Sequence, residues 1–261
     1  GGHRRALVGQ CSARRLLQLA KSAAGQDDVK PGLYKGQGAG AADPGTGSGD
    51  DGDLAVGAHW PKTPESSLHD NRHMRYFPGM NLGRVLIIAG SDSGGGAGIQ
   101  ADIKTVTALG GYAATAITAI TVQNTLGVHG VHAVPPAVVE AQARAVLDDI
   151  GADAVKTGML GDTEMVERVA AILETVRVPI VVDPVMVAKG GSNLLSPGAV
   201  DAVRSLMVPR AAVLTPNAPE ALALTGLAIH TTDDLRRAGE RLLALGARAV
   251  LMKGGHVAGA T

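Results

Sequence analysis

The stretch AGSDSGGGAGIQAD, residues 89–102, joins an apolar run of strand length at residues 85–88 to a segment with a helical pattern. Four glycines, at positions 94, 95, 96 and 98, leave its backbone almost bare. Backbone N–H groups in such a loop can approach a ligand closely, and positive φ angles cost little. A helix that starts just after the loop favours a bound anion or polar group, and Gln100 and Asp102 would fall in its first turn. The stretch therefore predicts a strand-loop-helix unit beside a small-molecule site.

The loop matches neither of the two common phosphate-binding patterns. The dinucleotide fingerprint would need a glycine at position 99, which is Ile99, and the Gly-Lys-Ser/Thr of a P-loop does not follow. Glycine-rich loops between a strand and a helix also occur where only tight packing is needed. On the residues alone, ligand binding and packing both stay open for this loop.

The composition excludes several classes of function for this chain of 261 residues. Its formal net charge is zero, which gives no basis for binding nucleic acid or an anionic membrane surface. No apolar run approaches the ~20 residues that a membrane-spanning helix needs. The single cysteine, Cys11, excludes an internal disulfide framework and a cysteine-rich metal site, so we expect a reducing, cytoplasmic setting.

The first 79 residues differ in composition from the rest of the chain. Residues 36–53 are rich in Gly, Asp and Ala without periodicity, and such a run buries too little to offset its ordering entropy. Residues 13–20 form an Arg-rich amphipathic piece of the kind that a transit peptide contains. The alternative is an extension upstream of a natural start at Met74 or Met80. We expect residues 1–79 to be a disordered or non-native extension.

Residues 80–261 alternate between apolar runs of strand length and helical patterns, which predicts one folded domain. Strands are expected near residues 84–89, 114–120, 153–157, 179–183, 211–215 and 248–252. Helices are expected near residues 98–109, 136–149, 162–175, 197–207, 217–225 and 232–245. Continuous apolar strands imply burial on both faces, and hence a mainly parallel sheet. The alternation predicts a doubly wound α/β fold with right-handed crossovers, in which residues 128–133 form a short edge strand or a flap.

Polar or glycine-rich residues follow each predicted strand. The segments are 90–92, 122–125, 156–160, 183–191, 215–220 and 253–256. Ligands of open parallel sheets bind beyond the carboxyl ends of the strands. One such end is easily structural, but six at one edge are hard to explain as packing.

Taken one by one, these residues have structural explanations as well as functional ones. Asp183 ends an apolar strand, where a half-buried carboxylate is costly unless it binds a cation or donors. Asn217 and Glu220 fit a turn residue and an acid in a first helical turn, but together with Asp183 they suggest an oxygen-ligand Mg²⁺ site. Lys253 fits a solvated strand end or a phosphate contact, and Met159 fits the core or an adaptable pocket wall.

Seven segments, in this order, resemble the hydroxymethylpyrimidine/phosphomethylpyrimidine kinases of thiamine biosynthesis. They read AGSDSGGGAGIQAD, TAITVQNTLGV, KTGMLGD, VVDPVMVAKGG, LLSP, LTPNAPEA and LMKGGH. The resemblance runs from about residue 84 to the last residue, and no part of it falls in residues 1–79. It implies a ribokinase-like fold and two successive ATP-dependent phosphorylations. The first is of the hydroxymethyl group of 4-amino-5-hydroxymethyl-2-methylpyrimidine, and the second is of the resulting monophosphate.

The resemblance also implies roles for the residues at the strand ends. It moves the glycine-rich loop to the pyrimidine side of the site, where Asp102 and Gln123 would bind the pyrimidine, aided by Gly90 and Met159. An aminopyrimidine edge presents donors and acceptors, which a carboxylate or an amide can match.

On the nucleotide side, the resemblance implies a site for ATP and Mg²⁺. Asp183 and Glu220 would hold the metal and its waters, with Asn217 beside them contributing to cofactor binding, and Lys253 would lie by the phosphates. Residues 128–133 would fall in the small lid and dimer region of the family, so a homodimer is expected.

The chain departs from the family pattern at its end, because the family continues into a Gly-Thr-Gly-Cys segment that forms the anion hole. That segment would lie beyond Thr261, so no catalytic residue is assigned, and we expect a domain incomplete at its C-terminus with weak or no turnover. Two alternatives remain open. One is a pyridoxal kinase, and the other is a non-catalytic pyrimidine-binding remnant.

Overall fold

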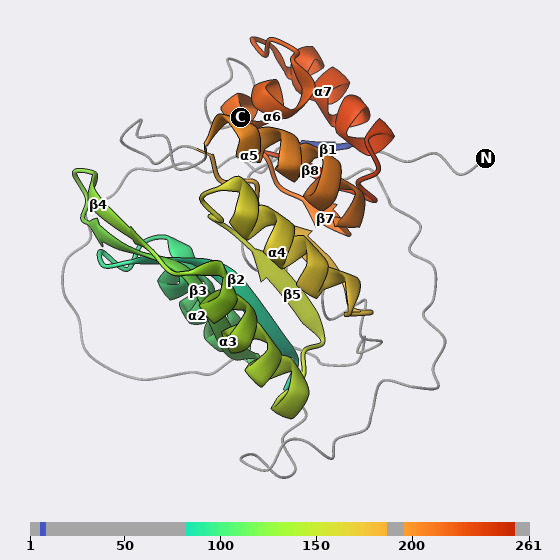
Figure 1. Cartoon of the computed structure of the whole chain (residues 1–261). Helices are drawn as coiled ribbons and strands as arrows, with labels where there is room; N and C mark the ends of the chain where they lie inside the picture. Colours follow the sequence, from blue (N-terminus) through green and yellow to red (C-terminus); the bar gives the residue numbers. More distant parts are fainter. Residues whose placement is uncertain (1–5, 9–81, 187–195, 254–261) are drawn as a thin grey trace, which may run out of the picture.

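The computed structural model describes residues 6–8, 82–186 and 196–253. Their strands form one sheet in the order β1-β8-β7-β6-β5-β2-β3-β4 (Figure 1). The strands are β1 (Ala6–Val8), β2 (Arg84–Asp92), β3 (Tyr112–Gln123), β4 (Val128–Ala133), β5 (Ala154–Thr157), β6 (Ile180–Val182), β7 (Val213–Leu214) and β8 (Val250–Met252). All neighbouring strands are parallel except β3 and β4, which pair antiparallel.

Helices connect the parallel strands of the sheet. They are α2 (Gly98–Ala108), α3 (Pro136–Asp149), α4 (Thr163–Glu174), α5 (Pro197–Ala202), α6 (Ala218–Thr225) and α7 (Thr232–Ala244). A π-helical segment (Val203–Met207) and a 3₁₀ turn (Val208–Arg210) extend α5. The doubly wound, mainly parallel α/β fold predicted from the sequence is confirmed.

Strand β2 shows why the apolar runs are continuous. Leu86 and Ile88 lie in the large core that includes residues of α3 and α4, whereas Val85 and Ile87 pack with residues of α2. Side chains alternate between the two faces of a strand, so helices on both faces require apolar residues at every position. The continuous apolar pattern therefore places β2 in the middle of the fold.

Several predicted bounds change in the structure. Strand β3 is longer than the predicted 114–120, and the predicted helix 197–207 leaves α-helical geometry after Ala202. Asp102 lies one residue beyond the first turn of α2, which holds no acidic residue, so this detail of the prediction was wrong. Residues 128–133 form β4, an edge strand that extends away from the body of the domain (Figure 1).

Some predictions fall on residues outside the described ranges. They concern most of residues 1–79, the Lys-Gly-Gly segment at 189–191 and the residues after Lys253. Among the described residues, no helix combines the length and the apolar character needed to cross a membrane.

The strand order reverses direction at β2. From β2 the chain moves to β3 on one side, and it later returns to place β5 on the other side of β2. Such a switch point opens a crevice at the carboxyl ends of the strands, where ligands of doubly wound sheets bind. The register of β2 shifts between Ala89 and Ser91, and that of β3 shifts between Val122 and Gln123. Irregularities of this kind re-aim side chains at the rim of a sheet.

Candidate active site

The glycine-rich loop between β2 and α2 satisfies its own N–H groups. The buried carboxylate of Asp92 accepts hydrogen bonds from the backbone N–H groups of Gly94, Gly96 and Ala97, at 2.7, 3.0 and 2.8 Å. Gln100 accepts from the N–H of Asp92 at 2.7 Å. An anion could use these N–H groups only by displacing Asp92, because a donor cannot serve two acceptors well. The loop is thus organised around an internal carboxylate and does not form a ready phosphate cradle.

The loop packs tightly against the end of β2. Gly98 opens α2 with φ +55°, and a Cβ atom there would lie 2.3 Å from the carbonyl oxygen of Gly90. Only glycine fits both the positive φ and the close approach of the backbone. The glycine therefore fixes the distance between β2 and the start of α2, the helix that carries Asp102.

Asp102 forms an ion pair with Lys156, a residue that the sequence placed at a strand end without giving it a role. The Nζ of Lys156 lies 2.6 Å from Oδ2 of Asp102, and the two side chains are 18% and 24% exposed. Burial raises the pKa of Asp102 above its ordinary value, and the Lys156 ammonium partly opposes this rise. The pair joins α2 to β5 at the switch point of the sheet.

Gly90 and Met159 lie in contact, as two walls of one site would. A Cβ atom at position 90 would lie 2.5 Å from the methyl carbon of Met159, so the methionine occupies the space that the glycine leaves. The hydroxyl of Thr118 donates to the carbonyl of Met159 at 2.6 Å and fixes its backbone.

Gln123 ends β3 beside the glycine-rich loop. Its N–H donates to Oγ of Ser93 at 2.8 Å, and its carbonyl accepts from the same hydroxyl at 2.6 Å. Its side-chain oxygen accepts from the hydroxyl of Thr121 at 3.3 Å. Serine 93 thus ties the loop to the strand end that carries Gln123.

A second cluster forms at the ends of β6, β7 and β8. The Nζ of Lys253 lies 2.8 Å from Oδ1 of Asp183 and 3.7 Å from Oε2 of Glu220. The hydroxyl of Thr215 donates to Oδ1 of Asp183 at 3.0 Å. Asn217 and Glu220 form a capping box at the start of α6, with two hydrogen bonds of 2.8 Å. The structure thus brings together all four residues that the sequence predicted on the nucleotide side.

This second cluster holds more acidic than basic groups. Two carboxyl groups share one ammonium group, and burial raises the pKa of Glu220 to about 7 despite the nearby Lys253. No group of three His, Cys, Asp or Glu residues that could hold a metal ion by itself occurs in the described ranges. The donor set fits Mg²⁺, which keeps several waters and is often bound by one or two carboxylates together with substrate phosphates.

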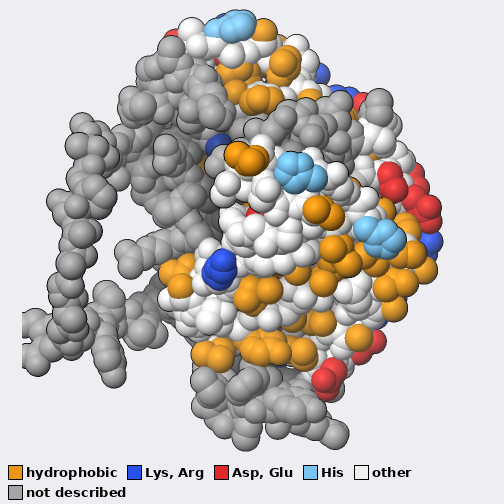
Figure 2. All heavy atoms as spheres, turned by 90° about the vertical axis from the view of Figure 1, so that its left-hand side faces the viewer, with side chains coloured by type: hydrophobic (Ala, Val, Ile, Leu, Met, Phe, Trp, Pro, Cys, Tyr) orange, Lys and Arg blue, Asp and Glu red, His pale blue; other side chains and the backbone are white. Residues whose placement is uncertain are grey.

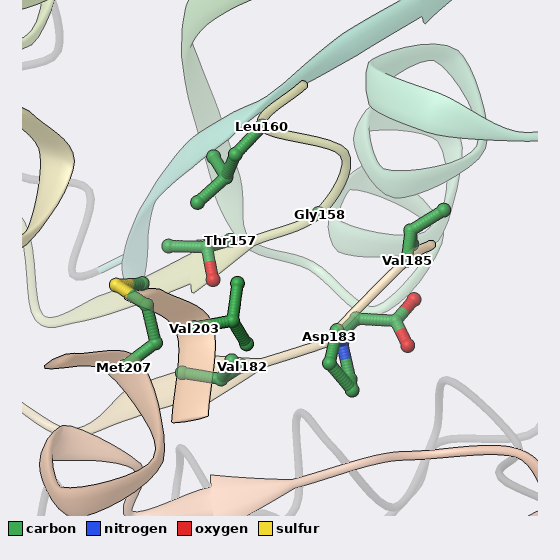
Figure 3. A pocket seen from close by; sticks show the side chains of 9 residues that line it. Thr157, Gly158, Leu160, Val182, Asp183, Val185, Val203 and Met207 are labelled. Atoms are coloured by element: carbon green, nitrogen blue, oxygen red, sulfur yellow. The ribbon is translucent and has the colours of Figure 1, made fainter. Parts of the chain in front are cut away.

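A small apolar cavity of about 10 Å³ lies behind this cluster, between the sheet and the π-helical segment. Figure 3 shows the carboxylate of Asp183 turned away from the cavity, whereas the hydroxyl of Thr157 faces Val203 and Val182. That hydroxyl is buried and has no hydrogen-bond partner among the described residues. The cavity has room for about one water molecule and is too small for a heterocycle. The polar side chains at the edge of the sheet therefore define the candidate site.

A family model described as phosphomethylpyrimidine kinase matches residues 92–261. The chain belongs to the phosphomethylpyrimidine kinase family. It is 56% identical over 176 residues to the thiamine biosynthesis bifunctional protein ThiED of Geobacter sulfurreducens. It is 53% identical over 175 residues to the hydroxymethylpyrimidine/phosphomethylpyrimidine kinase of Streptomyces coelicolor. Each match covers 67% of this chain, which spans 36% of the first relative and 65% of the second.

Solved structures of this family and of related kinases have the same fold. The phosphomethylpyrimidine kinase of Clostridium difficile aligns with a TM-score of 0.64 at 47% identity, over 68% of this chain and 77% of that protein. The pyridoxal kinase of Staphylococcus aureus, in complex with pyridoxal, aligns with a TM-score of 0.62 at 41% identity, over 67% of this chain and 66% of that protein. The ribokinase-like fold implied by the resemblance is thereby confirmed.

Sequence reasoning missed three residues that organise the site. They are Asp92 in the glycine-rich loop, Lys156 on β5 and Thr215 at the end of β7. Lys156 carried a usable signal, because a lysine inside an apolar strand must find a partner or reach solvent. Asp92 had none, since acidic residues are ordinary in turns.

Proposed function

We propose that this chain forms the pyrimidine site and the metal–phosphate site of an ATP-dependent kinase. Its substrates are 4-amino-5-hydroxymethyl-2-methylpyrimidine and the corresponding monophosphate. The observation that carries the proposal is the pair of polar clusters at one edge of the sheet, one with a balanced ion pair and one with two carboxyl groups for a single ammonium group. The family match and the names of the relatives support it.

On the pyrimidine side, Asp102 and Gln123 bind the polar edge of the heterocycle. A carboxylate oxygen accepts from the amino group, and a side-chain amide both donates and accepts. Gly90 leaves space that the Met159 side chain occupies, and Met159 lines the pyrimidine site with a side chain that adapts its shape.

On the nucleotide side, Asp183 and Glu220 hold Mg²⁺ through oxygen atoms and waters. Asn217 orients Glu220 through the capping box, and Lys253 contacts the phosphates. When bound, ATP would supply the phosphoryl group and Mg²⁺ would neutralise charge on it during transfer. Phosphoryl transfer depends mainly on positioning and charge, so these residues contribute by placing the two substrates. The proposed setting is the cytoplasm, in keeping with a single cysteine in the whole chain.

Calorimetry on this chain tests the proposal without depending on turnover. Binding of the pyrimidine alcohol, and separate binding of ADP with Mg²⁺, are the expected results. If the chain bound the pyrimidine but not the nucleotide, the result would favour the alternative of a non-catalytic pyrimidine-binding protein. Binding of neither ligand by the folded chain would overturn the proposal.

A pyridoxal kinase is the second candidate, because kinases of that name align with TM-scores above 0.6 at about 40% identity. Pyridoxal also carries a hydroxymethyl group on a six-membered nitrogen heterocycle. Calorimetry with pyridoxal beside the aminopyrimidine discriminates the two, and we expect tighter binding of the aminopyrimidine. Tighter binding of pyridoxal would favour the second candidate.

We also propose that the chain forms a homodimer through the β3–β4 edge. Figure 2 shows hydrophobic side chains gathered on the face of the molecule that includes this edge. Ile120 and Val122 lie on one face of β3 and are 52 and 62% exposed, and Leu126, between β3 and β4, is 85% exposed. Val131 pairs with Thr121 and is 52% exposed on the opposite face. Neighbouring exposed apolar side chains such as Ile120 and Val122 are typical of an interface. Sedimentation should give a dimer that Val122→Lys dissociates, and a monomer at high concentration would exclude the interface.

A further inference from the structure

Lys156 stands out as a charged residue within the sheet. It lies on β5, between Val155 and Thr157, which are both fully buried, and its own side chain is only 18% exposed. Strand β5 pairs with β2 on one side and with β6 on the other, so the lysine lies at the switch point. An ammonium group with so little solvent needs a close acceptor.

Its acceptor is Asp102, which comes from a different element 54 residues away. Only Oδ2 of Asp102 takes part in the pair, at 2.6 Å. The other oxygen, Oδ1, accepts no hydrogen bond from the described residues and is not among the buried side-chain atoms that lack a partner. One oxygen is therefore held by the lysine, while solvent or a ligand can reach the other.

Gly158 leaves the space that this arrangement needs. A Cβ atom at position 158 would lie 3.1 Å from Nζ of Lys156 and 3.0 Å from Cβ of Ala89. These contacts are closer than ordinary van der Waals packing. The glycine thus admits the lysine side chain beside β2, on the route to Asp102.

The electrostatics agree with this geometry. Burial raises the pKa of Asp102, the charge of Asp183 raises it further, and the Lys156 ammonium is the main influence that lowers it. Without the lysine, the carboxyl group would bind a proton more readily. A protonated Asp102 would offer its substrate a different set of donors and acceptors.

We propose that Lys156 is a positioning residue of the pyrimidine site, whose ammonium holds Asp102 in one orientation with Oδ1 open to the amino group of the substrate. The inference rests on the proposed function, in which Asp102 binds the pyrimidine. Lys156 acts through Asp102 and does not itself contact the heterocycle.

The test is a double-mutant cycle with a rescue variant. The proteins are the unchanged chain, Lys156→Met, Lys156→Arg, Asp102→Asn and the double variant Lys156→Met/Asp102→Asn. The ligands for calorimetry are 4-amino-5-hydroxymethyl-2-methylpyrimidine and, as a control for the other cluster, ADP with Mg²⁺. Thermal unfolding of each protein reports whether it is folded. The double variant keeps the test possible if a single variant unfolds, because neutral replacement of both partners leaves no unpaired charge.

Lys156→Met should weaken pyrimidine binding by about tenfold or more, the size expected for loss of one charged hydrogen bond. Lys156→Arg should restore most of it, and ADP binding should stay the same in all variants. In the Asp102→Asn background, Lys156→Met should cause no further loss, since the lysine acts only through the carboxylate.

Three outcomes would overturn the inference. Unchanged pyrimidine binding in folded Lys156→Met would leave the lysine a purely structural role. A further loss in the double variant would mean that Lys156 contacts the ligand directly. If the chain without substitutions did not bind the pyrimidine at all, the proposed function itself would be wrong. This outcome is distinguishable from the other two because it is measured without any variant.

Discussion

The two halves of the sheet edge hold the same kinds of residue in different proportions. At the ends of β2 and β5, one carboxylate and one ammonium group form a balanced pair, Asp102 and Lys156. At the ends of β6, β7 and β8, Asp183 and Glu220 share the single ammonium of Lys253. The Asp102–Lys156 pair is electrically neutral, and the second cluster has an excess of one negative charge when both carboxyl groups are ionised. Asp92, at the end of β2, is a further carboxylate, and backbone N–H groups of the glycine-rich loop satisfy it.

This difference suggests a separate partner for each half. The balanced Asp102–Lys156 pair suits an uncharged heterocycle, because binding it leaves neither charge of the pair without its partner. A site with excess negative charge favours an additional cation, and the pKa of about 7 for Glu220 shows how strongly burial opposes its ionisation without one. The packing differs as well. Residues of α2 pack with Val85 and Ile87 of β2, whereas Val181, Val213, Ala249 and Leu251 form an apolar cluster that contains no residue of a described helix.

Of the substitutions considered, Gly98→Ala should cause the largest loss of stability, because it disturbs the packing of α2 against β2. The new Cβ would lie 2.3 Å from the carbonyl oxygen of Gly90 and would sit at φ +55°, so α2 must move away from β2. We expect the free energy of unfolding to fall by about 3–4 kcal/mol. Urea unfolding measures this loss, with Gly127→Ala as the matched control because its Cβ meets nothing within 4 Å. Equal stability of the two variants would contradict the packing described for the loop.

The charged half should respond to pH through Glu220. The pKa of this carboxyl rises from its ordinary 4.5 to about 7 on folding, so between these values the folded chain binds a proton that the unfolded chain has released. The contribution of Glu220 to the free energy of unfolding should therefore be largest below about pH 4.5. It should fall by about 3 kcal/mol as the pH rises from 4.5 through 7.

The matched variant for this experiment is Glu220→Gln, which keeps a side-chain oxygen for the capping box with Asn217. Urea unfolding at pH ~5 and pH ~7.5 should give a smaller fall in stability for the variant than for the unchanged chain. The same fall in both proteins would mean that another group causes it.

Lys253→Met should weaken binding of one ligand, the nucleotide, without affecting binding of the other, the pyrimidine. The substitution leaves Asp183 and Glu220 without their shared ammonium and removes the proposed phosphate contact. We expect binding of ADP with Mg²⁺ to weaken about thirtyfold, ~2 kcal/mol, while pyrimidine binding stays the same. Calorimetry with each ligand measures the contrast. Equal losses for both ligands would show that the halves do not act separately.

Thr157→Val should give the smallest effect, and one of the opposite sign. Within the part of the chain that the structure describes, the hydroxyl of Thr157 is buried without a partner, so replacing it by a methyl group should raise the free energy of unfolding by about 1 kcal/mol. Thr215→Val is the control, because the hydroxyl of Thr215 donates to Asp183 and its loss should destabilise the fold. Destabilisation by Thr157→Val would indicate an ordered water in the small cavity.

Much of the fold could be predicted because its signals are local. The apolar runs are continuous where helices cover both faces of the sheet, as at residues 85–88, and this pattern needs no knowledge of distant contacts. The bounds were less predictable. The helix after Pro197 changes to π-helical geometry at Val203, where Arg204 reaches the carbonyl groups of Ala223 and Leu224 at the end of α6. That contact joins segments about 20 residues apart, so the pattern of one helix does not reveal it.

The candidate site shows the same division. Strand ends in a parallel sheet meet at one edge, so Asp183, Asn217, Glu220 and Lys253 could be grouped from their positions alone. The partner of Asp102 could not be predicted, because Lys156 becomes its neighbour only once β5 lies beside β2. The role of Asp92 could not be predicted either. Its hydrogen bonds depend on the conformation of the glycine-rich loop, and a glycine-rich sequence is compatible with many conformations.

The sequence by itself determined the order of strands and helices from residue 84 onward, the mainly parallel sheet, the edge at which the polar residues gather, and the resemblance that led to the family. These properties follow from periodicity and from motifs that are read along the chain. The sequence did not predict β1 (Ala6–Val8). Only the tertiary structure decided which charges face one another: Asp102 with Lys156 in a neutral pair, and Lys253 between Asp183 and Glu220. The physical reason is that electrostatic interactions depend on separations of a few ångströms, and strand order, not spacing along the chain, sets those separations.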